Sequence, residues 1–408
     1  MCAAILPSLL LCAVANSQTV SGQAAPSDQA LNGQLQTGDV IAGQTLNVES
    51  ATGPVVAATT AVGNSATALG QQANLDFESS QATQGRVAAT TTFAVSGYAP
   101  SVTASTSAVG NTSTAGTCCG GTTGTTSQTV GGDVGATTNV TLAGAVGSAA
   151  FDSSAIGNTH GWNAVNGSVY ATSNQTQNAS TTALVQGTPV EVDGPSSYTA
   201  EAIANNVSAN TTSSPTTLTV NQTNNGGSYG VDAEALIGQH TGADVLVATT
   251  ATGNNINVSG NGYAQELQST QVNNAGTNSD ATFVNDNASG QITVSAYGLG
   301  NSAIVSNAGP YTAMATDQES NGSVNAVATF NGTSTGGVYA TSTGVGNAVS
   351  GYACGTCQGT FQAYNTQNNQ NAVTAQTYLT SVGVAGGVAG SASAIGNTAT
   401  YQVTKNSH

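Results

Sequence analysis

The residues that could act as acid–base catalysts, nucleophiles or metal ligands are few and far apart in this sequence. The three histidines, His160, His240 and His408, lie 80 or more residues apart, with no cysteine or carboxylate at metal-ligand spacing. The only basic residues are Arg86 and Lys405. Acid–base chemistry on a substrate needs grouped titratable side chains. No phosphate-binding glycine loop with a lysine and no calcium nonapeptide is present either. We therefore expect structural histidines, no enzymatic activity, no metal and no cofactor.

The charge balance excludes further classes of partner. Eighteen acidic residues against two basic ones give a formal net charge of -16. Nucleic-acid binding neutralises phosphates with many lysines and arginines, and adsorption to anionic lipid also needs basic clusters. We expect neither kind of partner. The acidic residues are scattered singly, which is typical of a solvated surface.

A Gly-Asn pair recurs along the chain and defines a repeat. The gaps between successive pairs are 47, 47, 96, 47, 46 and 50 residues, and the long gap holds a degenerate copy at Ala204-Asn205. A glutamine follows 18 residues after the first residue of most pairs, and 21 residues after it near Cys354. The asparagines are Asn64, Asn111, Asn158, Asn205, Asn254, Asn301, Asn347 and Asn397, and the glutamines are Gln81, Gln128, Gln175, Gln222, Gln271, Gln318 and Gln367. We predict about eight units of 47 residues within 16–408, marked at positions 63, 110, 157, 204, 253, 300, 346 and 396.

The two halves of a unit also resemble each other. Residues 169–179, in a glutamine half, match residues 338–348, in a Gly-Asn half, at seven of eleven positions. This similarity favours two turns per unit and about 16 turns in all. Stacked at roughly 4.8 Å per turn, they would form a rod on the order of 75 Å long.

The local sequence is typical of short strands between turns. Runs such as residues 87–95 are β-branched and partly alternating, and Gly and Asn bound them. Units this small cannot fold alone, so they are expected to stack as an all-β solenoid whose exposed end turns can bind a partner or a second copy. Stacked asparagines and glutamines would form amide ladders. The alternative is that these polar positions line a ligand groove.

Four cysteines follow the leader: Cys118, Cys119, Cys354 and Cys357. Cys118 and Cys354 each lie 8 residues after the glycine of a marker pair, five units apart, which far exceeds the roughly 4.4 to 6.8 Å between the Cα atoms of a disulfide. Bridges within each local pair, or between molecules, remain open. The aromatic residues Trp162, Tyr98, Tyr263 and Tyr352 could stack on sugar rings or could instead cover the core.

The N-terminus predicts an exported protein. Residues 1–15 combine a short apolar run with a small-x-small cleavage pattern, Ala13-Val14-Ala15. We interpret them as a signal peptide, although the usual basic residues are missing. No later segment is apolar over the roughly 18 residues that a membrane helix requires.

Two motifs carry a family resemblance: Gly63-Asn64-Ser65-Ala66 and residues 370–376 resemble curlin-type repeats. As a whole, the acidic chain rich in Gly, Ala, Thr and Asn resembles the HfaD family, the holdfast attachment proteins of stalked alphaproteobacteria. The resemblance implies an outer-membrane surface protein that anchors an adhesive exopolysaccharide, the holdfast, in biofilm attachment. It also implies a curlin-like partner and a lipoprotein secretion pore, and it carries no catalytic or binding motif onto particular residues.

Two other functions stay open at this point. A self-polymerising, curli-like amyloid matrix subunit would have nearly identical repeats, whereas these repeats drift. A phage or secreted adhesin fibre would usually carry a trimerisation or translocation domain, which we do not find in the sequence.

Overall fold

The computed structural model describes residues 28–227, 229–354, 360–383 and 386–404, and their regular structure consists of 24 β-strands in three sheets of eight. Sheet A contains β1 (Asp28–Gln36), β4 (Leu75–Thr83), β7 (Gly121–Val130), β10 (Ser168–Gln177), β13 (Thr216–Asn224), β16 (Gln265–Asn273), β19 (Tyr311–Ser320) and β22 (Thr360–Asn369). Sheet B contains β2 (Val40–Val48), β5 (Val87–Val95), β8 (Val134–Val146), β11 (Thr181–Val192), β14 (Val231–Gly242), β17 (Thr277–Ala288), β20 (Val324–Ser334) and β23 (Val373–Ser381). Sheet C contains β3 (Val55–Gln71), β6 (Val102–Cys118), β9 (Ala149–Val165), β12 (Ser196–Thr212), β15 (Val245–Asn261), β18 (Ile292–Asn307), β21 (Val338–Ala353) and β24 (Val388–Val403).

Three consecutive strands, one from each sheet, make one coil, and eight coils stack to form a β-solenoid. All neighbouring strands within a sheet are parallel, and β1 pairs with β4 so that Asp28 lies opposite Leu75, 47 residues further on. The predicted all-β solenoid of eight 47-residue repeats is confirmed. The prediction of two turns per repeat is wrong, because the 47-residue unit is a single coil.

The similar half-units therefore lie in different sheets. Val169 begins the matching run in β10 of sheet A, whereas Val338 begins it in β21 of sheet C. Similar sequence in the two halves reflects similar strands, since both must place small and β-branched side chains inward.

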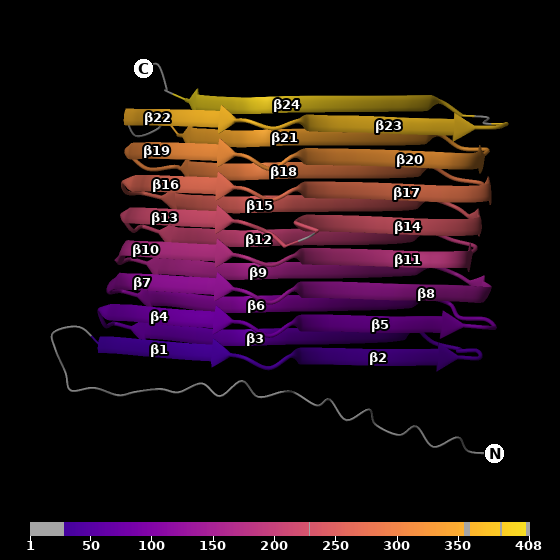
Figure 1. Cartoon of the computed structure of the whole chain (residues 1–408), viewed down its shortest axis with the longest axis horizontal. Coiled ribbons are helices and arrows are strands. Elements are labelled where there is room, and N and C mark those ends of the chain that lie inside the picture. Colours follow the sequence, from indigo (N-terminus) through magenta and orange to yellow (C-terminus); the bar gives the residue numbers. More distant parts are fainter. Residues whose placement is uncertain (1–27, 228, 355–359, 384–385, 405–408) are drawn as a thin grey trace, which may run out of the picture.

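The coil is flat, and the molecule is a slab rather than a rod. The strands of sheets A and B follow each other in one direction on one face, and the long sheet C strands return behind both (Figure 1). The longest axis runs along the strands (Figure 1), and a 17-residue strand spans about 55 Å at roughly 3.3 Å per residue. Eight coils span only about 34 Å from first to last at roughly 4.8 Å per step, so the expected 75 Å rod is wrong.

Two separate cores lie between the faces. One packs sheet B against the first half of each sheet C strand and includes Phe93, Phe283 and Phe330. The other packs sheet A against the second half of sheet C and includes Phe77 and Trp162. Inward positions form columns that run from coil to coil, and stacked rings such as Phe283 and Phe330, 6.1 Å between centroids, fill them.

The Gly-Asn pair lies in the middle of each sheet C strand, between the two cores. From Val102 to Ala115 in β6, buried and more exposed residues alternate except at Gly110 and Asn111, which are adjacent and both buried. Because of this irregularity, the inward side chains before the pair pack against sheet B, and the inward side chains after it pack against sheet A. A Cβ atom on Gly110 would lie 2.5 Å from the carbonyl oxygen of Gly157 in the next coil, which explains why glycine precedes the asparagine in most copies.

Several features named in the sequence analysis lie outside the described residues: the predicted signal peptide at 1–15, Cys357 and His408, together with the side chain of His240. In the part of the chain that the structure describes, no helix is long and apolar enough to cross a membrane.

Candidate functional site

The marker asparagines form one continuous buried column. Each Nδ2 donates to the Oδ1 of the next asparagine at 2.8 to 2.9 Å, from Asn64 to Asn111 and onward to Asn397. In the seven coils before the last, the same Nδ2 also donates to a backbone carbonyl near the end of the sheet A strand of the next coil, such as that of Thr129 for Asn111. These side-chain amides are buried and hydrogen-bonded to one another, so they do not line a ligand groove.

The marker glutamines form a second column inside the core between sheets A and C. Nε2 of each donates to Oε1 of the preceding glutamine at 2.7 to 2.9 Å, beginning with Gln81 to Gln34 and ending with Gln367 to Gln318. A second bond goes to a sheet C carbonyl, as from Gln128 to Thr159. The two columns have opposite polarity, because the asparagine donors point toward the C-terminal coil and the glutamine donors toward the N-terminal coil.

A further amide ladder lies on the surface, at positions that the sequence analysis did not identify. Nδ2 of Asn225, Asn274 and Asn321 donates to Oδ1 of Asn178, Asn225 and Asn274 respectively, at 2.8 to 2.9 Å. All three bonds are exposed, directly after the sheet A strands. A period of 47 to 49 residues is the signal that could have identified this ladder. It presents neutral amides in a regular row beside the hydroxyl-rich outer face of sheet A.

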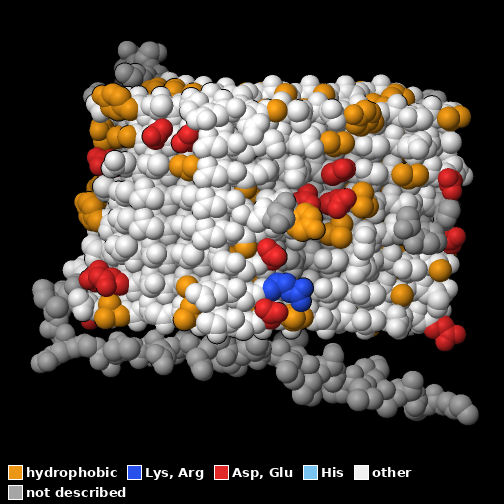
Figure 2. Space-filling model, viewed as in Figure 1, with side chains coloured by type: hydrophobic (Ala, Val, Ile, Leu, Met, Phe, Trp, Pro, Cys, Tyr) orange, Lys and Arg blue, Asp and Glu red, His pale blue; other side chains and the backbone are white. Residues whose placement is uncertain are grey.

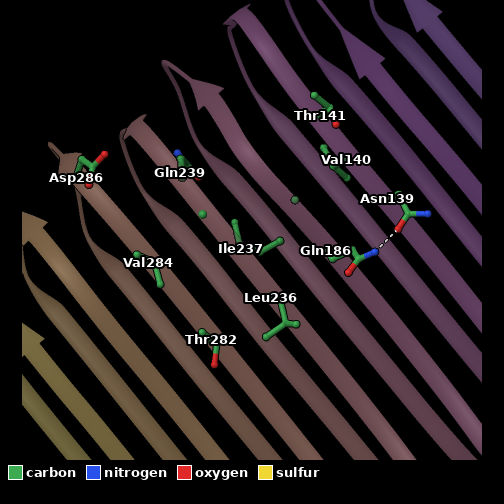
Figure 3. Close-up of a pocket in the computed structure, with 12 residues that line it drawn as sticks. Asn139, Val140, Thr141, Gln186, Leu236, Ile237, Gln239, Thr282, Val284 and Asp286 are labelled. Atoms are coloured by element: carbon green, nitrogen blue, oxygen red, sulfur yellow. Dashed lines mark hydrogen bonds between the residues drawn. The ribbon is translucent and has the colours of Figure 1, made fainter.

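A groove of about 1010 Å³ opens on sheet B (Figure 3). Val140, Gly187 and Ile237 occupy the same inward position in three successive coils. Because Gly187 has no side chain, it leaves a gap in this column at the floor of the groove. The register of β11 also shifts after Gly187, with both neighbouring strands. The lining residues come from β8, β11, β14 and β17: Asn139, Val140, Thr141, Gln186, Gly187, Leu236, Ile237, Gly238, Gln239, Thr282, Val284 and Asp286.

The groove combines apolar walls with amide, hydroxyl and carboxylate groups. Leu236 and Val284 offer hydrocarbon surface. Nε2 of Gln186 donates to Oδ1 of Asn139 in the adjacent coil at 2.6 Å. Thr282 and Asp286 add oxygen atoms on the far side (Figure 3). Such a surface can pack on the face of a sugar ring while its amides and hydroxyls bond the ring substituents. The sequence analysis missed this groove because a strand bulge has no marker there.

Three carboxylates share the outer face of sheet B with the groove. Figure 2 shows acidic and hydrophobic side chains gathered just right of the centre of the view, over the part of sheet B nearest sheet A. Burial, followed by the neighbouring charges of Glu234 and Asp280, raises the pKa of Asp232 to about 6. The pKa values of Glu234 and Asp280 are also raised, chiefly by burial. No described cation offsets this repulsion, so proton binding at Asp232 must be coupled to folding.

His160 has a structural environment. The ring is 1% exposed, stacks on Phe77 and meets Trp162 edge-on, with centroids 4.4 Å apart for the latter pair. Nδ1 shares a hydrogen bond with Oγ of Ser113, whereas Nε2 has no partner among the described residues. Burial lowers the pKa of His160 to about 3. The histidine is therefore neutral at physiological pH.

The cysteines lie at the corner between sheets C and A. Cys118 ends β6 and Cys119 adopts a left-handed backbone with φ of 67°, and both are exposed with sulfur atoms 2.9 Å apart. Cys354 directly follows β21, whose last residue pairs with Asn307 in the preceding coil. This places Cys118 and Cys354 on the same corner, five coils apart. Among the described cysteines, only the Cys118-Cys119 pair has its sulfur atoms close together.

The aromatic candidates divide by exposure. Trp162 is fully buried, and its Nε1 donates to Oγ of Ser173 at 2.8 Å, so it cannot contact a sugar. Tyr98 and Tyr263 are about half exposed, and Tyr352 is half-buried. Among the described residues, no group of three or more His, Cys, Asp or Glu side chains could hold a metal ion.

Comparison with known proteins gives one result. The family model for holdfast attachment protein D matches residues 49–322, about two thirds of the chain. No curated protein and no solved structure shows a significant match. The matched segment begins just before β3 and ends just after β19, so it covers the groove on sheet B and most of both buried amide ladders. The chain belongs to the family of holdfast attachment protein D.

Proposed function

We propose that this chain is exported to the outer membrane and there anchors an adhesive exopolysaccharide, the holdfast, to the cell. The observation that carries the proposal is the family match over residues 49–322. Attachment proteins of this family act at the cell surface. The outer-membrane site, the exopolysaccharide as direct partner and the absence of catalysis are parts of the proposal.

The surface supports contact with a neutral polymer. The exposed asparagine ladder offers an amide in each of four successive coils, and the groove at Gly187 adds the amides of Asn139 and Gln186 and the hydroxyl of Thr282. Each hydrogen bond to a sugar contributes about 0.5 to 1.5 kcal/mol net. Repetition along the stack converts such weak contacts into avidity. With only Arg86 and Lys405 as basic residues, the attraction would depend little on salt.

The gene deletion tests the anchoring role. Cells without the gene should still synthesise the polysaccharide but release it into the medium, which lectin or dye staining of cells and supernatant would measure. Cells that retain the polysaccharide would refute anchoring. Cells that never make it would assign the chain to synthesis or export instead.

Point variants test the multivalent surface. We expect the double variant Asn139→Ala, Gln186→Ala to weaken retention less than threefold, because other coils still bind. Adding Asn225→Ala and Asn274→Ala should weaken it further. Matched alanine changes on the outer face of sheet C, at Thr293 and Ser295, serve as the control. A complete loss from the first double variant would instead indicate a single pocket.

Two protein partners are also proposed, on the family resemblance alone: a curlin-like protein and a lipoprotein of the secretion pore. Crosslinking on intact cells, followed by capture of this chain, should recover both. Recovery of neither would remove them from the proposal without affecting the polysaccharide assay.

A further inference from the structure

The two ends of the stack are open sheet edges that carry matching residues. Among the described strands, the first coil (β1 to β3) and the last coil (β22 to β24) each have a neighbour on one side only. An edge of unpaired strands is a template for another chain. The inward columns that begin in the first coil end in the last coil with the same or similar residue: Val40 and Val373, Ala42 and Ala375, Leu46 and Leu379, Val55 and Val388, Gln34 and Gln367, Asn64 and Asn397.

The opposite polarity of the two buried ladders makes the ends complementary. At the first coil, Oδ1 of Asn64 has no described donor, and Nε2 of Gln34 has one N–H in a bond to Ser65 and one left over. At the last coil, Nδ2 of Asn397 makes only a long bond of 3.4 Å to the carbonyl of Gln367, and Oε1 of Gln367 has no described donor. The Asn64 acceptor at the first coil thus matches the Asn397 donor at the last coil, and the Gln34 donor matches the Gln367 acceptor.

Only one relative orientation uses this match. Placing the last coil of one copy under the first coil of another aligns the Asn397 donor with the Asn64 acceptor and the Gln34 donor with the Gln367 acceptor. Two first coils placed together would oppose two asparagine acceptors, and two last coils would oppose two donors. Head-to-tail placement also keeps every strand parallel to its new neighbour, as in the eight-stranded sheets.

The end coils expose many apolar side chains. Eleven of the twenty exposed large hydrophobic side chains lie in the first and last coils. Some point outward, such as Leu31, 44% exposed, and Tyr364, 74% exposed, and others, such as Val388, hold inward positions that no described coil covers. Leu31 and Tyr364 terminate the same outward row, whose intervening members are Glu78, Thr125, Thr172, Thr219, Gln268 and Ala315. Head-to-tail contact would make the two side chains neighbours and bury part of both.

We propose that copies of this chain stack head to tail, with β22, β23 and β24 of one copy pairing in register with β1, β2 and β3 of the next. Both amide ladders then run without a break from copy to copy. The interface is heterologous, so the assembly is a polar filament that grows by addition at its ends.

One isosteric substitution tests the contact. Asn397→Asp keeps the oxygen that accepts from Asn347 but replaces the outward donor with a carboxylate, which would face the Asn64 oxygen of the next copy. The control Gln402→Glu makes the same amide-to-carboxylate change in β24 on an exposed side face. With the full-length chain, sedimentation and negative-stain microscopy should show filaments whose assembly concentration rises about tenfold or more in Asn397→Asp and stays unchanged in Gln402→Glu.

A mixing experiment tests the polarity. The Asn397→Asp chain retains a normal first coil, so it can add to the last coil of a wild-type filament and then block growth there. Substoichiometric amounts should therefore shorten wild-type filaments. Circular dichroism and the melting temperature of the variant check that it is folded. Wild-type chain that stays monomeric at all concentrations, or Asn397→Asp that assembles like wild type, would overturn the proposal.

Discussion

Nδ2 of Asn158 donates to Oδ1 of Asn205 at 2.9 Å, although 47 residues of chain separate them. Asn205 follows Ala204, the one position where alanine replaces the marker glycine. Asn205 itself donates onward to Asn254 at 2.8 Å, across a coil two residues longer. The column thus continues through both irregularities, which indicates that the amide, more than the glycine or the coil length, fixes the register of neighbouring coils.

Asn158→Asp should destabilise the fold by about 3 kcal/mol, because a carboxylate would face Oδ1 of Asn205 and the carbonyl of Thr176 with no donor. Chemical denaturation at pH 7 measures the loss. The loss should shrink at acidic pH, where a protonated carboxyl can donate again. The control Asn163→Asp, exposed on the same strand, should change stability by less than about 0.5 kcal/mol. Equal effects of the two variants would contradict a role of the buried ladder.

Gly110→Ala should cost about 1 to 3 kcal/mol. The new Cβ would lie 2.5 Å from the carbonyl oxygen of Gly157 and 2.7 Å from Cγ2 of Val130, so neighbouring coils would have to separate. Thermal unfolding followed by circular dichroism measures the change. Gly43→Ala is the matched control, since nothing lies within 4 Å of its new methyl group. A larger loss in the control would show that backbone freedom matters more than this close approach.

Asp232→Asn should remove a pH dependence of stability. The pKa of Asp232 is about 6 in the folded chain, against an ordinary value of 3.8, so the folded state binds more protons between these values. Its contribution to stability is therefore full below about pH 4 and is lost as pH rises through 6. The asparagine variant should be more stable than wild type at pH 7 by roughly 2 kcal/mol. Asp317→Asn, an exposed change on sheet A, should show no such gain.

His160→Phe should remove a pH dependence of opposite sign. Burial lowers the pKa of His160 to about 3 from 6.5, so the unfolded state binds more protons in that window. Stability is full above about pH 6.5 and falls on acidification by up to about 1.4 kcal/mol per pH unit. Between pH 4 and 6 the contributions of Asp232 and His160 to stability therefore have opposite slopes. In this range, the slope of the unfolding free energy against pH should become more positive in Asp232→Asn and more negative in His160→Phe than in wild type. Slopes that change in the same direction in both variants would contradict these assignments.

Regular features of this fold could be predicted from sequence, and local irregularities could not. The spacing of Asn64, Asn111 and Asn158 coincides with the strand pairing because identical residues stack where one coil repeats the last. The similarity of residues 169–179 and 338–348 was misleading, because strands in different sheets have the same composition without stacking on each other. The groove at Gly187 depends on a register shift in a single coil, and a period cannot reveal the one place where it fails.

Deleting residues 111–157 tests whether one coil equals one 47-residue unit. The deletion joins Gly110 to Asn158, so the shortened strand keeps a Gly-Asn pair at its centre, and Asn64 would donate to Asn158 instead of Asn111. We expect a folded solenoid of seven coils, shorter by about 4.8 Å along the stack, with a melting temperature within a few degrees of wild type because each coil contacts only its neighbours.

Deleting residues 111–134, about half a unit, joins half of a sheet C strand to a sheet B strand. No register of the remaining coils then satisfies both amide ladders. That variant should aggregate or lose its β-sheet circular dichroism signal. If the half-unit deletion folds as well as the full-unit deletion, the coil is not the folding repeat.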